Sequence, residues 1–147
     1  MERYGKFEDL EVWKLSMRLS LTIYGLFKEC KDYGFKDQIQ RACVSVPANI
    51  AEGDERQTNK ESVQFFYIAR GSSAEVRTFL HLAIALKYVP QDKGLDIIDQ
   101  YKKVSSMLYR LIENRRTDVV RRPTENGCRP AAGGERVTEK GKRRELK

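Results

Sequence analysis

The stretch that decides the fold is Gln38-Ile-Gln-Arg-Ala-Cys-Val-Ser-Val-Pro-Ala-Asn-Ile-Ala-Glu-Gly53. A repeat of about 3.6 residues places four apolar side chains on one helical face: Ile39, Cys43, Val46 and Ile50. It places four polar side chains on a separate face: Arg41, Ser45, Asn49 and Glu52. We therefore expect a helix over residues 37–53. Pro47 lies inside it and should bend it, because proline removes one backbone hydrogen bond.

The ends of this helix are expected at turn-forming residues. Lys31-Asp-Tyr-Gly34 interrupts the preceding apolar pattern, with Gly34 as the turn residue. Asp37 can then start the helix, and Gly53 is expected to end it.

Three further helices are expected, over residues 9–30, 58–88 and 92–115, with no strand. Thr58 and Glu61 have the spacing of a capping box, and Asp92 is expected to cap the last helix. The predicted fold class is therefore all-α, an up-down four-helix bundle. The first helix carries two apolar stripes, which are Leu10, Trp13, Met17, Leu21 and Tyr24, and Val12, Leu15, Leu19, Ile23 and Leu26. One of them predicts apolar surface left over for an interface.

Gly71 interrupts the helix expected over residues 58–88, within the small-residue run Gly71-Ser-Ser-Ala74. Glycine is about 1 kcal/mol less favourable than alanine inside a helix. We expect a compensating gain from close approach of a neighbouring helix, with the small side chains facing the bent part of residues 37–53.

Basic charge is concentrated near the C-terminus. Residues 1–114 carry 17 Lys and Arg against 16 Asp and Glu, whereas residues 115–147 carry 11 against 5. The C-terminal residues are also rich in glycine and proline and poor in large apolar side chains, so they cannot bury enough surface to offset their ordering entropy. We expect a bundle domain over residues 1–115 and a disordered basic tail over residues 116–147.

The sequence lacks the patterns of several functional classes. No uncharged apolar run approaches the roughly 20 residues that span a bilayer, and we expect no signal peptide. Cys30, Cys43 and Cys128 have no Cys-x-x-Cys spacing, which favours a reducing, cytoplasmic location. His81 is the single histidine and is expected at the surface. Without a zinc set, a catalytic triad or a phosphate loop, we expect no catalytic residue, no metal and no cofactor.

The basic C-terminal residues could neutralise phosphates in a flexible arrangement, giving salt-sensitive binding without sequence preference. The alternative is a solvated extension with no specific role. The candidate residues are Arg115, Arg116, Arg121, Arg122, Lys140, Lys142, Arg143 and Arg144.

Four segments resemble the bacterial four-helix-bundle proteins encoded in ribosomal-RNA intervening sequences. They are residues 41–53, Phe7-Glu-Asp-Leu-Glu-Val-Trp13, residues 65–69 and Arg70-Gly-Ser-Ser-Ala-Glu75, and the resemblance covers about residues 5–113. It implies a bundle that assembles as a cyclic homopentamer. The chain is also similar to the pentameric accessory proteins of diversity-generating retroelements, which bind a reverse transcriptase and nucleic acid.

The resembling segments hold polar residues that could act together. Glu52 and Glu75 could form a paired general acid and base in one pocket. The structural alternative is a buried or interfacial network that fixes helix and subunit contacts, and we favour it because the resembling proteins carry these residues without a defined reaction. That network would comprise Arg41, Ser45, Asn49, Glu52, Arg70, Gly71, Ser72 and Glu75.

These observations favour a non-enzymatic oligomeric protein that binds nucleic acid, in the form of structured RNA or an RNA–protein complex. The assembled ring and its basic tails would provide the contacts, because linked weak sites gain from effective concentration. The alternative is an oligomeric scaffold for a protein partner, such as a reverse transcriptase or a ribosomal-RNA-associated protein, with the tail incidental.

Overall fold

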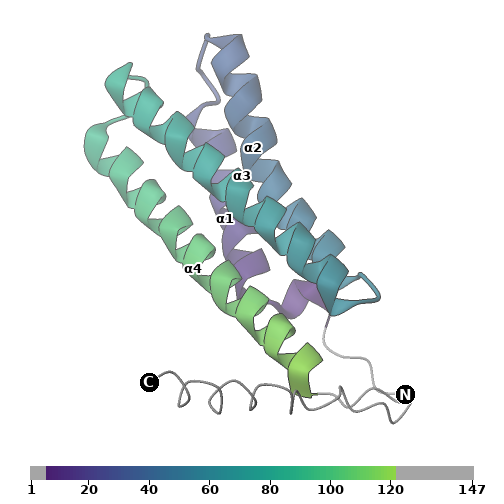
Figure 1. Ribbon diagram of the computed structural model, residues 1–147. Helices are drawn as coiled ribbons and strands as arrows, with labels where there is room; N and C mark the ends of the chain where they lie inside the picture. Colours follow the sequence, from purple (N-terminus) through teal and green to yellow (C-terminus); the bar gives the residue numbers. More distant parts are fainter. Residues whose placement is uncertain (1–5, 122–147) are drawn as a thin grey trace, which may run out of the picture.

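The computed structural model describes residues 6–121, with side chains as far as Thr117, and these residues form a bundle of four long helices (Figure 1). A short 3-10 helix, η1 (Phe7–Asp9), precedes α1 (Glu11–Leu26), α2 (Tyr33–Asp54), α3 (Asn59–Ala85) and α4 (Gln91–Arg121). Each helix packs on the two that flank it around the bundle, so that α1 and α3 lie diagonally opposite. No strand occurs within residues 6–121. The predicted all-α up-down bundle is confirmed.

The core consists of the apolar faces that the helical spacing predicted. Ile39, Cys43, Val46 and Ile50 of α2 are fully buried. They meet side chains from the other three helices, which include Ile23, Phe66, Val76, Leu80, Ile97, Tyr101, Val104 and Leu108. None of the helices of residues 6–121 is long and apolar enough to cross a membrane.

One of the two apolar stripes of α1 belongs to this core, and of the other only Leu10 and Trp13 pack against it. Val12, Leu19 and Ile23 are buried, whereas Met17, Leu21 and Tyr24 are 38%, 71% and 46% exposed. The expected apolar surplus on the first helix is therefore present at the surface of the chain.

The connection between α1 and α2 differs from the prediction. Helix α1 ends at Leu26 instead of Cys30, and α2 begins at Tyr33. Asp32, not Asp37, caps α2, because its carboxylate accepts a hydrogen bond from the Phe35 backbone N–H at 3.2 Å. Gly34 consequently lies in the first turn of α2 and not in the turn before it.

Pro47 is buried inside α2, which continues as a helix through it. Because proline has no N–H, the carbonyl of Cys43 loses its donor from within the helix. The hydroxyl of Ser20 on α1 lies 3.1 Å from this carbonyl and 2.9 Å from the Ser16 carbonyl of its own helix, so the two carbonyls share its one hydrogen. A side chain of the neighbouring helix thus replaces part of the backbone bond that Pro47 removes.

The close helix contact expected at Gly71 occurs at other glycines. Gly71 is exposed, and a Cβ atom built on it would meet nothing within 4 Å among the described residues. A Cβ on Gly53 would lie 2.7 Å from the ring of Phe66, and one on Gly94 would lie 2.6 Å from Ile84. The intrachain contact predicted for Gly71 is therefore wrong, because Gly71 faces outward while Ser72 and Ser73 face the neighbouring helices.

The ends of α3 and α4 also refine the prediction. The Thr58 hydroxyl accepts a hydrogen bond from the Glu61 N–H at 3.2 Å, as expected. The Glu61 carboxylate, however, accepts its hydrogen bond from the Thr58 hydroxyl and not from the backbone N–H of Thr58. Helix α4 begins at Gln91, so that Asp92 lies in its first turn and is not the cap. Helix α4 also continues to Arg121, beyond the boundary expected at residue 115.

Candidate nucleic-acid interface

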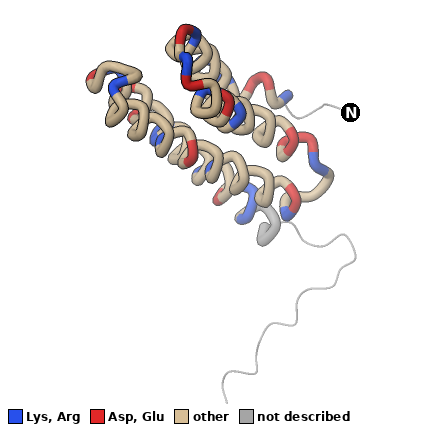
Figure 2. Tube along the Cα trace, turned by 90° about the horizontal axis from the view of Figure 1, so that it is seen from above, with Lys and Arg blue, Asp and Glu red and all other residues tan. Residues whose placement is uncertain are grey.

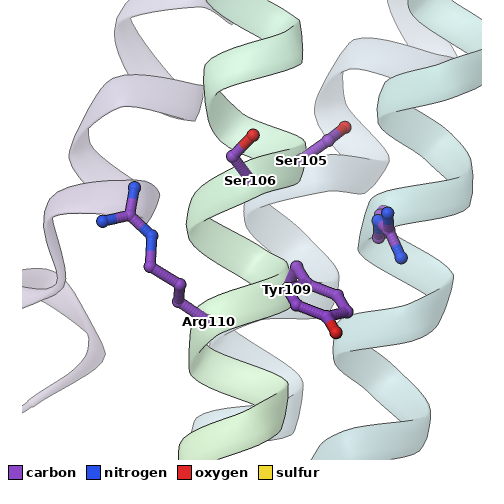
Figure 3. A pocket seen from close by; sticks show the side chains of 5 residues that line it. Ser105, Ser106, Tyr109 and Arg110 are labelled. Carbon is purple, nitrogen blue, oxygen red and sulfur yellow. The ribbon is translucent and has the colours of Figure 1, made fainter.

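A shallow surface pocket of about 390 Å³ lies on the outer face of α3 and α4. We call it the α3–α4 pocket, and its lining residues are Arg70, Ser105, Ser106, Tyr109 and Arg110. In Figure 3 the side chain of Tyr109 points to the α3 side of α4, whereas Arg110 extends to the opposite side. The pocket therefore combines two guanidinium groups with an aromatic ring and two hydroxyls.

The helical repeat explains why these side chains meet. Ser105 and Tyr109, like Ser106 and Arg110, are four residues apart and lie on successive turns of α4. Beneath them, the Ser73 hydroxyl donates to the Tyr101 carbonyl at 3.1 Å and lies 3.2 Å from the Ser105 hydroxyl. These small residues bring α3 close to α4, and this packing places Arg70 beside the α4 residues.

The pocket is electropositive. The Arg70 guanidinium carbon lies 5.4 Å from the centre of the Tyr109 ring, within the range of a cation–π contact. Among the described residues, neither Arg70 nor Arg110 has a carboxylate within ion-pairing distance. Residues 102–116 of α4 carry five Lys and Arg against one Glu, although both signs of charge are spread over the bundle as a whole (Figure 2). Lys102, Arg115 and Arg116 of this stretch pair with Asp99, Asp54 and Glu113. The charge open to an anionic ligand is therefore that of Arg70, Lys103 and Arg110, for which no carboxylate among the described residues lies within ion-pairing distance.

Part of the predicted polar network exists. The hydroxyls of Ser45 on α2 and Ser72 on α3 are 2.9 Å apart, and the Asn49 amide donates to the Ser45 hydroxyl at 2.9 Å and to its carbonyl at 2.8 Å. The half-buried cluster therefore joins α2 to α3, close in sequence to Pro47.

The charged residues predicted for the same network lie elsewhere. Arg41 is exposed and pairs with Asp37 at 3.0 Å, and Glu52 pairs with Arg56. Glu75 is exposed, and Gly71 faces outward. The structure therefore brings no paired acid and base together from Glu52 and Glu75, and a buried ionic network within the described chain is wrong.

Two of the predicted C-terminal basic residues belong to the bundle. The Arg115 guanidinium donates to the Asp54 carboxylate at 2.7 Å and lies over the ring of Phe66, which ties the end of α4 to the end of α2. Arg115 is therefore a bundle residue and not part of a tail. Arg116 is exposed on α4 and pairs with Glu113 at 3.6 Å.

The other predicted phosphate-binding residues are beyond the described side chains. Arg121 is the last residue of α4, and its side chain lies outside the described ones. The remaining five are Arg122, Lys140, Lys142, Arg143 and Arg144, which lie outside the described residues.

Other candidate chemistry within residues 6–121 is sparse. A second surface pocket, lined by Phe7, Ala48, Ala51, Glu52, Glu55 and Arg56, holds more carboxylates than guanidiniums and has no excess of positive charge. His81 is exposed on α3, as expected. Burial raises the pKa of the Cys43 thiol from its ordinary value of 9.0 to about 11, which keeps it protonated and unreactive near neutral pH. The described residues contain no group of His, Cys, Asp or Glu arranged to hold a metal ion.

Sequence reasoning identified Arg70 but missed the four α4 residues of the pocket. Their signal was the run Ser105-Ser-Met-Leu-Tyr-Arg110, in which polar and aromatic residues recur four apart on the face opposite Val104 and Leu108. This pattern contains one basic residue, whereas residues 115–147 contain 11, so charge alone does not single it out.

Comparison with protein families identifies the group to which the chain belongs. The model of the 23S rRNA-intervening sequence protein family matches residues 8–110. The chain belongs to this family. The matched range contains all five residues of the α3–α4 pocket, whereas Arg115 and the basic residues after it lie outside the range.

A solved structure shares the fold of this family member. It is a protein of unknown function from the S23 ribosomal protein family of Bacteroides thetaiotaomicron, with a TM-score of 0.66 and 24% sequence identity. The match covers 69% of this chain and 98% of that protein. Comparison with curated proteins found no match.

Proposed function

We propose that this 23S rRNA-intervening sequence protein is a non-enzymatic RNA-binding protein that contacts RNA through the α3–α4 pocket. The observation that carries the proposal is that Arg70, which lies over the Tyr109 ring, and Arg110 line one pocket and have no carboxylate partner among the described residues. Guanidinium groups bind phosphate by charge-assisted hydrogen bonds, and aromatic rings stack on bases. Lys103 of α4 is exposed, has no carboxylate within ion-pairing distance among the described residues, and adds to the attraction for a polyanion.

RNA is the nucleic acid we favour, because the family takes its name from sequences that interrupt 23S rRNA. Structured RNA or an RNA–protein complex in the cytoplasm would present both the phosphates and the bases that the pocket suits. The basic residues at 121–147 would add salt-sensitive contacts of their own.

Assembly as a ring of five is part of this proposal, and the exposed stripe of α1 supports self-association. Met17, Leu21 and Tyr24 form an exposed apolar strip on the outer face of α1, which no other described helix covers. A cyclic ring would present five copies of the pocket, so that weak contacts act together. Light scattering on the purified chain measures the mass directly. A single 17.1 kDa species at micromolar concentration would refute the ring.

The RNA-binding experiment compares salt-dependent affinity for a structured RNA between the full chain and a double variant, Arg70→Ala with Arg110→Ala. We expect the variant to bind about tenfold more weakly, with the salt slope reduced by about 1.4 for two lost contacts to single-stranded phosphates. The matched control replaces Arg18 and Lys28, which are exposed basic residues outside the pocket. Equal losses in both variants would place binding outside the pocket. A chain that ends at Arg121 leaves α4 whole and measures the contribution of the residues after it.

The alternative candidate is an oligomeric scaffold for a protein partner such as a reverse transcriptase. The exposed apolar stripe of α1 is the observation that favours it, because such strips commonly mark protein interfaces. Absence of salt-sensitive RNA binding by the full chain would favour the scaffold over the RNA-binding protein.

A further inference from the structure

The α3–α4 pocket has features that a surface for phosphates alone does not need. Cations are sufficient for phosphate contacts, yet the centre of this pocket is a tyrosine ring that is 49% exposed. Exposed rings beside cations are typical of surfaces on which single-stranded bases stack. Resting on the RNA-binding function proposed above, we infer that the pocket holds one unpaired ribonucleotide of the RNA, with its base stacked on Tyr109.

The Arg70 contact prepares the ring for stacking. Its guanidinium carbon lies 5.4 Å from the ring centre, and this cation–π contact holds Tyr109 on the α3 side. The exposed remainder of the ring is open to a ligand, and a ring that is already oriented loses less rotamer freedom on binding.

The arginines suit the backbone on either side of such a base. Arg110 extends from α4 away from Tyr109 in Figure 3. Arg70 belongs to α3, and its guanidinium lies over the Tyr109 ring. A nucleotide whose base sits on the ring has phosphates on both of its sides. Arg70, next to the ring, would bind one of them, and Arg110 would bind backbone that continues across α4.

The two serines would give the pocket a preference for RNA over DNA. The Ser106 hydroxyl donates to the Lys102 carbonyl at 3.2 Å, so its hydrogen is occupied. Ser73 gives its hydrogen to the Tyr101 carbonyl, and Ser105 therefore donates to Ser73. Both pocket hydroxyls are left with acceptor lone pairs only. They would accept a hydrogen bond from a ribose 2′-OH, the group that DNA lacks.

Continuous duplex RNA cannot satisfy this pocket. The bases of an A-form helix are stacked on one another, and its deep groove excludes side chains. A bulged or looped nucleotide can turn out of the stack and reach Tyr109. The class of ligand is therefore RNA with an unpaired nucleotide.

The experiment uses the full chain and two hairpin RNAs that differ by one bulged 2-aminopurine ribonucleotide. We expect the bulged hairpin to bind about 5- to 150-fold more tightly, with quenching of the bulge fluorescence as the base stacks. Tyr109→Ala should reduce its affinity to that of the paired hairpin and abolish the quenching, whereas Tyr109→Phe should retain both. Tyr33→Ala is the control, because Tyr33 is exposed outside the pocket. A 2′-deoxy bulge should bind about 2- to 10-fold more weakly than the ribonucleotide.

The outcomes separate the two proposals. If both hairpins bind equally and Tyr109→Ala changes nothing, the unpaired-base inference is overturned while RNA binding stands. If a 2′-deoxy bulge binds as tightly as the ribonucleotide, the part assigned to Ser105 and Ser106 is overturned. If neither hairpin binds, both the proposed function and this inference fail. Helical circular dichroism of each variant separates loss of binding from loss of folding.

Discussion

Replacing Gly53 by alanine should destabilise the bundle, whereas the same replacement at Gly71 should stabilise it. Both glycines lie within helices, so alanine offers each a gain in helix propensity of up to about 1 kcal/mol. Their surroundings differ. The new methyl group at position 53 would lie 2.7 Å and 2.9 Å from ring atoms of Phe66 and 3.0 Å from Phe65, while at position 71 it would meet nothing within 4 Å.

The expected change in unfolding free energy depends on whether the Phe66 ring can move away from the new methyl group. Phe66 is fully buried beneath the Arg115 guanidinium, so its ring cannot swing aside without disturbing the contact between α2, α3 and α4. Overpacking of this kind costs about 1–3 kcal/mol. Set against the propensity gain, it leaves Gly53→Ala destabilised by up to about 2 kcal/mol. Gly71→Ala should be stabilised by about 1 kcal/mol, so that the two variants differ by about 1–3 kcal/mol.

Urea unfolding followed by the helical circular dichroism signal measures both free energies. The comparison requires equal protein concentrations, because self-association would stabilise the folded chain by mass action. If Gly53→Ala proves as stable as Gly71→Ala, the close packing of α2 on Phe66 is refuted. Destabilisation by Gly71→Ala together with a lower oligomer mass would instead place Gly71 in a contact between subunits.

Three further predictions concern single residues. Ser20→Ala removes the donor that the Cys43 carbonyl shares with the Ser16 carbonyl, and urea unfolding should record a loss of about 1 kcal/mol, whereas the exposed Thr22→Ala should change little. Lys87 has a φ of 61°, so Lys87→Gly should relieve left-handed strain and raise the unfolding free energy by about 1 kcal/mol; a decrease would contradict that reasoning. Because burial raises the pKa of Cys43 from 9.0 to about 11, its contribution to stability is complete below pH 9 and is lost as the pH rises through 11. Cys43→Ala should flatten this part of the stability curve, and a thiol reagent at neutral pH should label Cys30 in the folded chain but not Cys43.

The general fold could be predicted because it depends on periodicity within single segments. The spacing of Ile39, Cys43, Val46 and Ile50 is enough to orient α2, and the corresponding spacings in the other helices bury their inner faces. The choice between Asp32 and Asp37 as cap was not determined in this way, since either can cap a helix. The burial of Phe35, whose ring lies against Phe27 at 5.6 Å, extends the helix back to Asp32.

The pocket could not be predicted from one segment because its residues come from two helices. The sequence marks Arg70 only as part of a motif. Its contact with Tyr109 depends on the axial register between α3 and α4, which neither helix determines alone. Gly71 illustrates the same limit. Its neighbours Ser72 and Ser73 face α2 and α4. Gly71 therefore faces outward, and this depends on the orientation of α3 about its own axis.

The buried serine hydroxyls also determine the register of the four helices. Heptads of similar apolar residues would still mesh if one helix slid by a turn, about 5.4 Å, along its neighbour. Such a slide would separate Ser20 from the Cys43 carbonyl, Ser45 from Ser72, or Ser73 from the Tyr101 carbonyl. Loss of Ser20 or Ser73 would leave a buried carbonyl without that donor, at about 1–3 kcal/mol, whereas the half-buried Ser45–Ser72 pair would cost less. The serines thus discriminate against shifted bundles that an all-apolar core would tolerate, and the native alignment is the one that aligns Arg70 with Tyr109.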